Sequence, residues 1–187
     1  MSESQTSNTS FSDYDCHLLG EGTHWGIYQL LGAHLVTVDG VCGVHFGVWA
    51  PNADMVQVVG NFNDWDGSKY EMRKLIPSGI WELFVPGVPE GESYKYRLQS
   101  GGQVLEKSDP FGFAAEIPPR TASIVSDLDR YAWEDAEWLQ RRAQSNGLNA
   151  PISIYEVHLG SWQRDPDHEN GWLSYRELAH RLVEYCT

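Results

Sequence analysis

The chain has 187 residues and a formal net charge of -13, from 26 acidic and 13 basic side chains. This acidic balance disfavours nucleic acids and anionic membranes as partners, because both require patches of Lys and Arg. Hydrophobic residues make up 41% of the sequence and aromatic residues 12%, which excludes the composition of a disordered chain.

The N-terminal residues 1–12 are rich in Ser, Thr and Asn, and we expect them to form a mobile tail. They have neither the basic and apolar segments of a secretory signal nor the arginines of a transit peptide. No run of 18 apolar residues that would span a membrane occurs in the sequence. Cys16, Cys42 and Cys186 are odd in number and far apart, so we expect free thiols in a reducing cytoplasm.

Short strands separated by turn residues are predicted from about residue 32 to residue 125. Apolar and polar residues alternate in most of them, as Val44, Phe46 and Val48 do with their neighbours. The predicted strands lie at 44–50, 55–59, 81–85, 94–98, 104–105 and 123–125. Half-apolar strands at roughly ten-residue spacing predict an antiparallel β-sandwich.

The pattern changes after residue 130. A short helix is predicted at 132–142, and the nearly continuous apolar run 152–160 suits a strand buried on both faces. Ser174 and Glu177 form a capping box that begins a helix, with Leu178, Leu182 and Tyr185 on one stripe. One strand–loop–helix unit cannot bury its own faces, so we expect the sequence to be truncated inside a larger domain.

A candidate sugar-binding site lies in the segment 60–67 (GNFNDWDG), which follows a strand and is crowded with turn formers. Trp65 would offer its ring to the apolar face of a pyranose, and Asn63 and Asp64 would hold sugar hydroxyls. Lys95, on the polar face of a strand, would donate to another hydroxyl. Two plainer interpretations stay open: Trp65 folds down to cap the sandwich, and Lys95 is an ordinary solvated lysine.

Other candidates for chemistry are weaker. Glu156 and His158 lie two residues apart on the predicted strand and share a face, but a structural hydrogen-bonded pair is favoured over an acid/base pair. The histidines at 17, 24, 34 and 45 show no ligand spacing, which disfavours a zinc site. Neither a P-loop nor a GxGxxG motif occurs, so no nucleotide cofactor is expected.

Ten motifs distributed over the chain carry a resemblance to a known family. They are 20–25 (GEGTHW), 31–34 (LGAH), 43–52 (GVHFGVWAPN), 58–67 (VVGNFNDWDG), 79–85 (GIWELFV), 94–96 (YKY), 108–111 (SDPF), 120–125 (RTASIV), 150–162 (APISIYEVHLGSW) and 172–178 (WLSYREL). In these motifs the chain closely resembles the bacterial glycogen branching enzymes of the α-amylase superfamily. The last two motifs are specific to branching enzymes rather than to amylases at large.

The resemblance implies four segments. Residues 1–31 form a tail and lead-in segment, 32–128 a carbohydrate-binding module of family 48, 129–150 a helical linker, and 151–187 the start of a catalytic (β/α)8 barrel. The expected fold class is mainly β: an immunoglobulin-like antiparallel β-sandwich followed by the first β-strand and α-helix of a truncated (β/α)8 barrel. A complete barrel needs about 250 residues.

The resemblance also implies a function. The chain would be the N-terminal glucan-binding and scaffolding portion of a 1,4-α-glucan branching enzyme, which makes α-1,6 branches in glycogen by transferring α-1,4-glucan chains. Its partners would be glycogen, maltooligosaccharides and the remainder of the barrel. The family's catalytic Asp, Glu and second Asp lie on later barrel strands, and none maps onto this chain. We therefore expect no catalytic residue, metal or cofactor here, and no activity of the chain alone.

The related glycogen-binding modules of AMP-activated protein kinase use a loop Trp and a Lys after a Tyr, which correspond here to Trp65 and Lys95. Their second Trp has no match in the hairpin 101–104 (GGQV), and their late Asn corresponds to Ala122. The resemblance thus implies weak glucan binding. Two alternatives remain: a stand-alone glycogen-binding or regulatory module, and a structural brace for the barrel.

Overall fold

The computed structural model describes residues 11–145, 147–167 and 170–187. The chain divides into two compact units, Met1–Ala132 and Trp133–Thr187, and each is described by itself. In the described ranges, none of the helices combines the length and the hydropathy needed to cross a bilayer.

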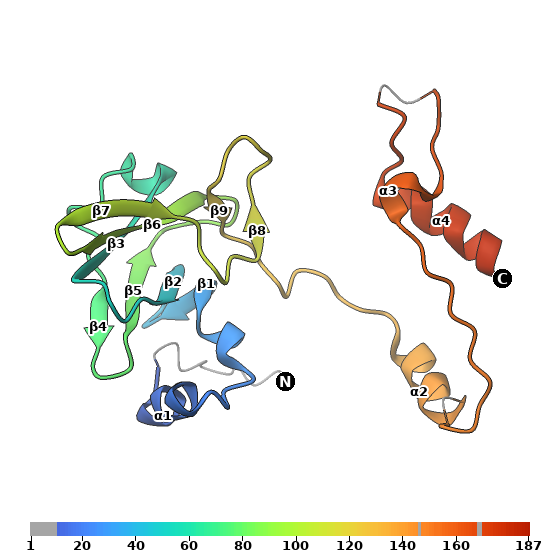
Figure 1. Ribbon diagram of the computed structural model, residues 1–187, viewed down its shortest axis with the longest axis horizontal. Helices are drawn as coiled ribbons and strands as arrows, with labels where there is room; N and C mark the ends of the chain where they lie inside the picture. The colour runs from blue at the N-terminus through green and yellow to red at the C-terminus, as the bar shows by residue number, and fades with distance from the viewer. Residues whose placement is uncertain (1–10, 146, 168–169) are drawn as a thin grey trace. The chain divides into compact units, whose positions relative to one another are not determined.

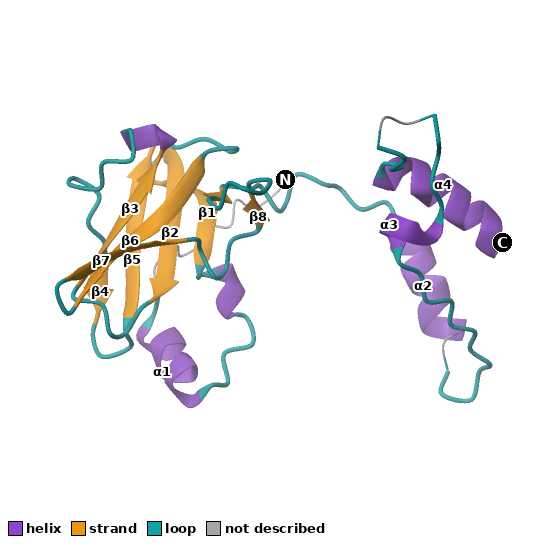
Figure 2. Ribbon diagram, turned by 45° about the horizontal axis from the view of Figure 1, so that its top comes forward, coloured by secondary structure: helices purple, strands orange, loops and turns teal. Residues whose placement is uncertain are grey.

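The first unit is built from two antiparallel sheets (Figures 1 and 2). One sheet has the order β1-β2-β5-β4, with β1 at Gly32–Val38, β2 at Val41–Trp49, β5 at Ile80–Pro86 and β4 at Arg73–Leu75. The other has the order β3-β6-β9-β8, with β3 at Met55–Gly60, β6 at Ser93–Ser100, β9 at Ser123–Ile124 and β8 at Ala114–Ala115, and β7 (Gln103–Lys107) also pairs with β6. The predicted mainly β, antiparallel architecture is confirmed.

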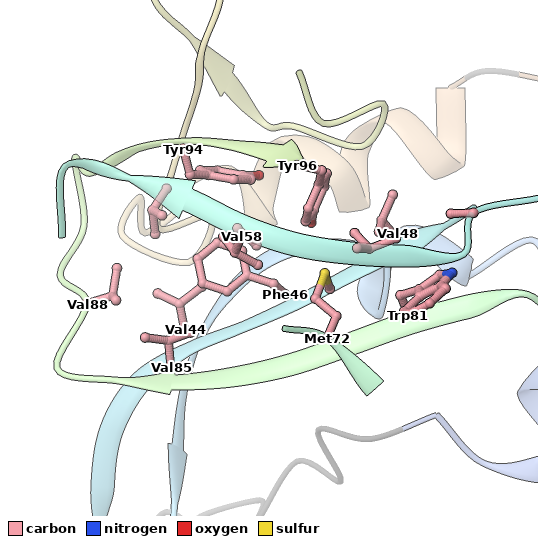
Figure 3. Packing of buried hydrophobic residues seen from close by; sticks show 14 residues of the cluster. Val44, Phe46, Val48, Val58, Met72, Trp81, Val85, Val88, Tyr94 and Tyr96 are labelled. Carbon is pink, nitrogen blue, oxygen red and sulfur yellow. The ribbon is translucent and has the colours of Figure 1, made fainter. Parts of the chain in front are cut away.

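The core lies between the two sheets, as Figure 3 shows. Alternation places one face of each strand inward: Phe46 of β2 meets Tyr94 of β6 edge to face, with ring centroids 5.1 Å apart. The fully buried or nearly buried members of this cluster include Val44, Phe46, Val48, Val56, Val58, Trp81, Val85, Tyr94 and Tyr96. Both sheets contribute to the list, so each is held by the other's apolar face.

The core also contains a hydrogen-bonded carboxyl group. Asp109 accepts hydrogen bonds from the hydroxyls of Tyr94 at 2.6 Å and Tyr96 at 3.2 Å, and from the backbone N–H of Phe111 at 2.8 Å. Burial raises the pKa of Asp109, and burial together with this carboxyl raises the pKa of both tyrosines. These bonds satisfy polar groups that would be costly to bury alone.

The lead-in segment packs on the outer face of the first sheet. It forms α1 (Asp13–Glu21) and the 3-10 helix η1 (Ile27–Gln29). Phe11 and Leu31 form a second buried cluster with Ile80 of β5. Residues 1–10 of the predicted mobile tail lie outside the described residues. For Phe11 and Ser12 that prediction is wrong, because Phe11 is buried and Ser12 caps α1.

The second unit contains α2 (Ala136–Ser145), α3 (Leu159–Trp162) and α4 (Tyr175–Cys186). The predicted capping box is present: the Ser174 backbone N–H donates to the Glu177 carboxylate at 2.8 Å, and the Glu177 N–H donates to the Ser174 hydroxyl at 3.4 Å. The strand predicted at 152–160 is wrong. Residues 151–158 form no regular element, and the described residues of this unit offer no neighbouring strand to pair with their backbone.

Candidate functional site

The loop that follows β3 is shaped by its own asparagine. It begins with the 3-10 helix η2 (Asn61–Asn63). The Asn63 side chain accepts from the Gly60 N–H at 2.9 Å and donates to the Val58 carbonyl at 3.0 Å. Asn63 therefore uses both ends of its amide to fold the loop.

Asp64 and Trp65 both adopt left-handed backbone conformations, with φ of 53° and 60°. Such conformations are uncommon for residues other than glycine, above all for a bulky one, and mark places that surrounding bonds must hold. The Trp65 N–H donates to the Gly60 carbonyl at 2.9 Å, and the indole Nε1–H donates to Asn61 Oδ1 at 3.1 Å. These bonds fix the indole against the start of its own loop.

The two aromatic residues of the loop have different surroundings. Phe62 packs against the core, with its ring 6.0 Å from that of Phe46 and 5.7 Å from that of Tyr70. Trp65 is half-buried and is absent from the described residues that pack against this core. Phe62 is thus the anchor of the loop, and the indole of Trp65 lies outside the sandwich interior.

The outer face of β6 carries the predicted lysine. Lys95 lies opposite Val59 in the β3–β6 register, and alternation places it on the face away from the buried tyrosines of β6. Its Nζ donates to the Thr121 hydroxyl at 2.8 Å. Two residues further on, and on the same face, Arg97 donates to the Trp65 carbonyl at 3.0 Å. The Trp65 loop and Lys95 therefore lie on the same face of this sheet.

Around these residues the structure adds partners that the sequence did not indicate. Arg97 could have been found from the alternation that also identified Lys95, whereas nothing in the sequence pointed to Thr121. Ala122, the expected counterpart of the late Asn in the related modules, is buried. The exposed Asp66 accepts from the N–H and hydroxyl of Ser68, and these bonds hold its pKa below the usual range.

The weaker candidates do not assemble into sites. Glu156 and His158 lie on the segment that forms no strand, and the His158 ring is within 2.8 Å of the Ser161 hydroxyl. Among the histidines, His24 pairs with Asp15 at 2.9 Å and His45 lies 3.4 Å from the buried Glu82. Over the part of the chain that the structure describes, no group of three or more His, Cys, Asp or Glu side chains is placed to hold a metal.

Comparison with known proteins gives one matching family and several similar enzymes. Residues 30–112 match the family described as Carbohydrate-binding module 48 (Isoamylase N-terminal domain). The chain is 54% identical over 177 residues to the 1,4-alpha-glucan branching enzyme GlgB of Rhodopirellula baltica. This alignment covers 94% of this chain and 24% of the relative. It is 56% identical over 176 residues to GlgB of Rubrobacter xylanophilus, with 93% and 24% covered. The chain thus spans about a quarter of the length of these relatives.

A solved structure shares the fold more distantly. Pullulanase from Paenibacillus barengoltzii, solved both without ligand and in complex with maltotetraose, aligns over 73% of this chain and 20% of its own length. The TM-score is 0.53 and the sequence identity 27%. The resemblance to glycogen branching enzymes that the motifs predicted is confirmed by the relatives at about half identity.

Proposed function

We propose that this chain is the N-terminal portion of a 1,4-α-glucan branching enzyme. Residues 30–112 match carbohydrate-binding module 48, and the chain matches branching enzymes along nine-tenths of its length. The observation that carries this proposal is the 54% identity over 177 residues. The whole protein would make α-1,6 branches in glycogen by transferring α-1,4-glucan chains. This portion would bind and position the glucan, and the catalytic carboxylates would lie in the part of the enzyme outside it.

The proposed domain organisation follows the same resemblance. Residues 32–128 would be the immunoglobulin-like module, 129–150 a linker, and 151–187 the start of the barrel, with the remainder of the barrel as partner. The division between the two compact units, after Ala132, falls inside the proposed linker and supports it. The free thiols of the three cysteines fit a reducing cytoplasm as the location.

The glucan site of this module would combine Trp65, Asn63, Asp64 and Lys95. The indole would stack on the apolar face of a glucose ring, and the carboxylate and ammonium groups would bind hydroxyls. Asn63 would hold the loop. Binding would be weak, because the second Trp is absent and the remaining contacts are open to water, where a hydrogen bond contributes less than in a buried site.

The test is calorimetric titration of the 187-residue chain with maltoheptaose. Trp65→Ala is expected to abolish most of the measurable binding and Lys95→Ala to weaken it several-fold, both with an unchanged circular dichroism spectrum. Trp25→Ala is the matched control, since Trp25 is an exposed tryptophan of the same unit. Unchanged binding by Trp65→Ala would place the glucan elsewhere, and unfolding of that variant would favour the structural brace.

A further inference from the structure

The carbonyl of Trp65 is held by an arginine from a neighbouring strand. Arg97 on β6 donates from Nη2 to this carbonyl at 3.0 Å. The same guanidinium donates from Nε at 3.0 Å and from Nη2 at 2.8 Å to Glu106, which lies opposite it on β7. The side chain of Arg97 is 29% exposed and that of Glu106 is 40% exposed. The guanidinium thus connects β7 and β6 to the loop that follows β3.

The two N–H groups of Trp65, by contrast, bond within the loop. The bonds from its backbone N–H and its indole N–H end on Gly60 and Asn61, within the same loop. They set the internal shape of the loop and make no bond to β6. Phe62 anchors the beginning of the loop to the core, three residues before the residue whose carbonyl Arg97 binds. The Arg97 contact is therefore suited to fix the Trp65 end.

We propose that Arg97 is a positioning residue of the glucan site: it holds the Trp65 backbone so that the indole stands at a fixed place beside Lys95, and Glu106 orients the guanidinium. This inference rests on the proposed function. A binding surface that is ordered before the ligand arrives loses less conformational entropy on binding. An isolated ion pair on the surface would contribute almost nothing to the stability of the fold. The Arg97–Glu106 pair differs from such a pair because the guanidinium also donates a third bond, to the Trp65 carbonyl.

The arginine cannot be replaced by another cation in this role. The planar guanidinium presents several N–H donors in a fixed fork, so it can serve a carboxylate and a carbonyl at once. A lysine would keep the charge while its flexible ammonium group lost this geometry. Arg97→Lys therefore separates positioning from simple charge attraction to an acidic module.

The experiment compares Arg97→Gln, Arg97→Lys and Glu106→Gln with Arg130→Gln, in the full 187-residue chain. Arg130 is the matched control because it forms an exposed ion pair with Glu90, at 3.2 Å, in the same unit. Two quantities are measured: the dissociation constant for maltoheptaose, and the 15N-indole resonance of Trp65 without ligand, identified by its loss in Trp65→Phe. Arg97→Gln is expected to raise the dissociation constant about fivefold, as freeing one ordered group would, and to shift and broaden the Trp65 resonance.

Arg97→Lys is expected to show most of the same loss, Glu106→Gln a smaller one, and Arg130→Gln none. An Arg97→Gln variant that binds as the wild type does, or that binds weakly with an unmoved Trp65 resonance, overturns the inference. Should Arg97→Gln fail to fold, Arg97→Lys and Glu106→Gln decide by the same criteria. If Trp65→Ala binds maltoheptaose normally, the glucan lies elsewhere and the proposed glucan site fails instead, while the Trp65 resonance in the Arg97 variants still reports whether Arg97 positions the loop.

Discussion

Two aromatic side chains three residues apart in one loop have separate tasks. Phe62 stacks on Phe46 and meets Tyr70 edge to face, so its ring extends the core beyond the end of β3. The indole of Trp65 is bonded to the loop itself and remains partly accessible. Stability and the proposed glucan binding thereby fall to different residues, and substitutions can separate them.

Phe62→Ala is expected to lower the free energy of unfolding of the first unit by about 3 kcal/mol, because it removes a ring packed on the core. Trp65→Ala should cost less than about 1 kcal/mol, as is usual for a side chain outside the core. Urea unfolding followed by circular dichroism measures both. Equal losses for the two variants would show that Trp65 is a packing residue.

The buried carboxyl of Asp109 makes the stability of the module depend on pH. Burial raises its pKa, so the folded chain holds this proton more tightly than the unfolded chain does. The corresponding contribution to the free energy of unfolding is therefore present at low pH and is lost as the pH rises from the unfolded value of about 3.9 through the raised, folded value.

Asp109→Asn removes this titration and leaves an amide oxygen to accept from Tyr94 and Tyr96. The free energy of unfolding of the wild type, minus that of Asp109→Asn, is expected to be larger at about pH 4 than at about pH 7. Urea titrations of both proteins at the two pH values give this difference directly. A difference that stays constant or grows with pH would contradict the assigned effect of burial.

At the scale of elements, the lead-in segment behaves as part of the module. The outer face of a sandwich sheet is ordinarily solvated, and here α1, η1 and the residues beside them cover it. Leu31 is 1% exposed and Ile80 is fully buried, although both lie outside the main core. The resemblance placed a boundary at residue 32, and this packing extends the buried structure to its N-terminal side.

Leu31→Ala is accordingly expected to destabilise the first unit by about 3 kcal/mol, since it opens a cavity in this second cluster. Trp25→Ala provides the contrast: its side chain is 91% exposed, and its removal should change stability by no more than about 0.5 kcal/mol. Thermal and urea unfolding of the two variants test the assignment. A Leu31→Ala variant as stable as Trp25→Ala would mean that the segment only lies on the sheet.

The elements also show what the sequence can and cannot predict. Strands such as β2 and β5 were predictable because one face of each meets the opposite sheet, which imposes alternation on the sequence. The apolar run at 152–160 has the composition of a buried strand, but a strand needs paired neighbours, and the described residues of the second unit contain none. In the site, residue types identified Trp65 and Lys95. The bonds from the Asn63 side chain to the backbone, and the bond from Arg97 to the Trp65 carbonyl, depend on the loop conformation, which no local sequence pattern specifies.

At the scale of the whole chain, the two units differ in how much they bury. The first has two buried clusters, one of them spanning both sheets. In the described residues of the second, only Leu173 and Leu178 are buried, while Trp133, Tyr175 and Tyr185 are each more than 60% exposed. Burial of apolar surface is the main stabilising contribution to folding, so the units should not be equally stable.

Hydrogen exchange should therefore separate the two units in the intact chain. Amides of β2, β5 and β6 can exchange only when a packed sheet opens, whereas α4 needs only to unwind from its few buried contacts. We expect peptides from residues 43–125 to be strongly protected and those from 151–187 to exchange rapidly, at a rate set by local helix opening. The capping box of α4 slows fraying of its first turn without supplying a core, so it does not alter this order. Protection of α4 equal to that of β2 would show that the second unit is stable by itself, and would count against the proposal that it is the beginning of a barrel.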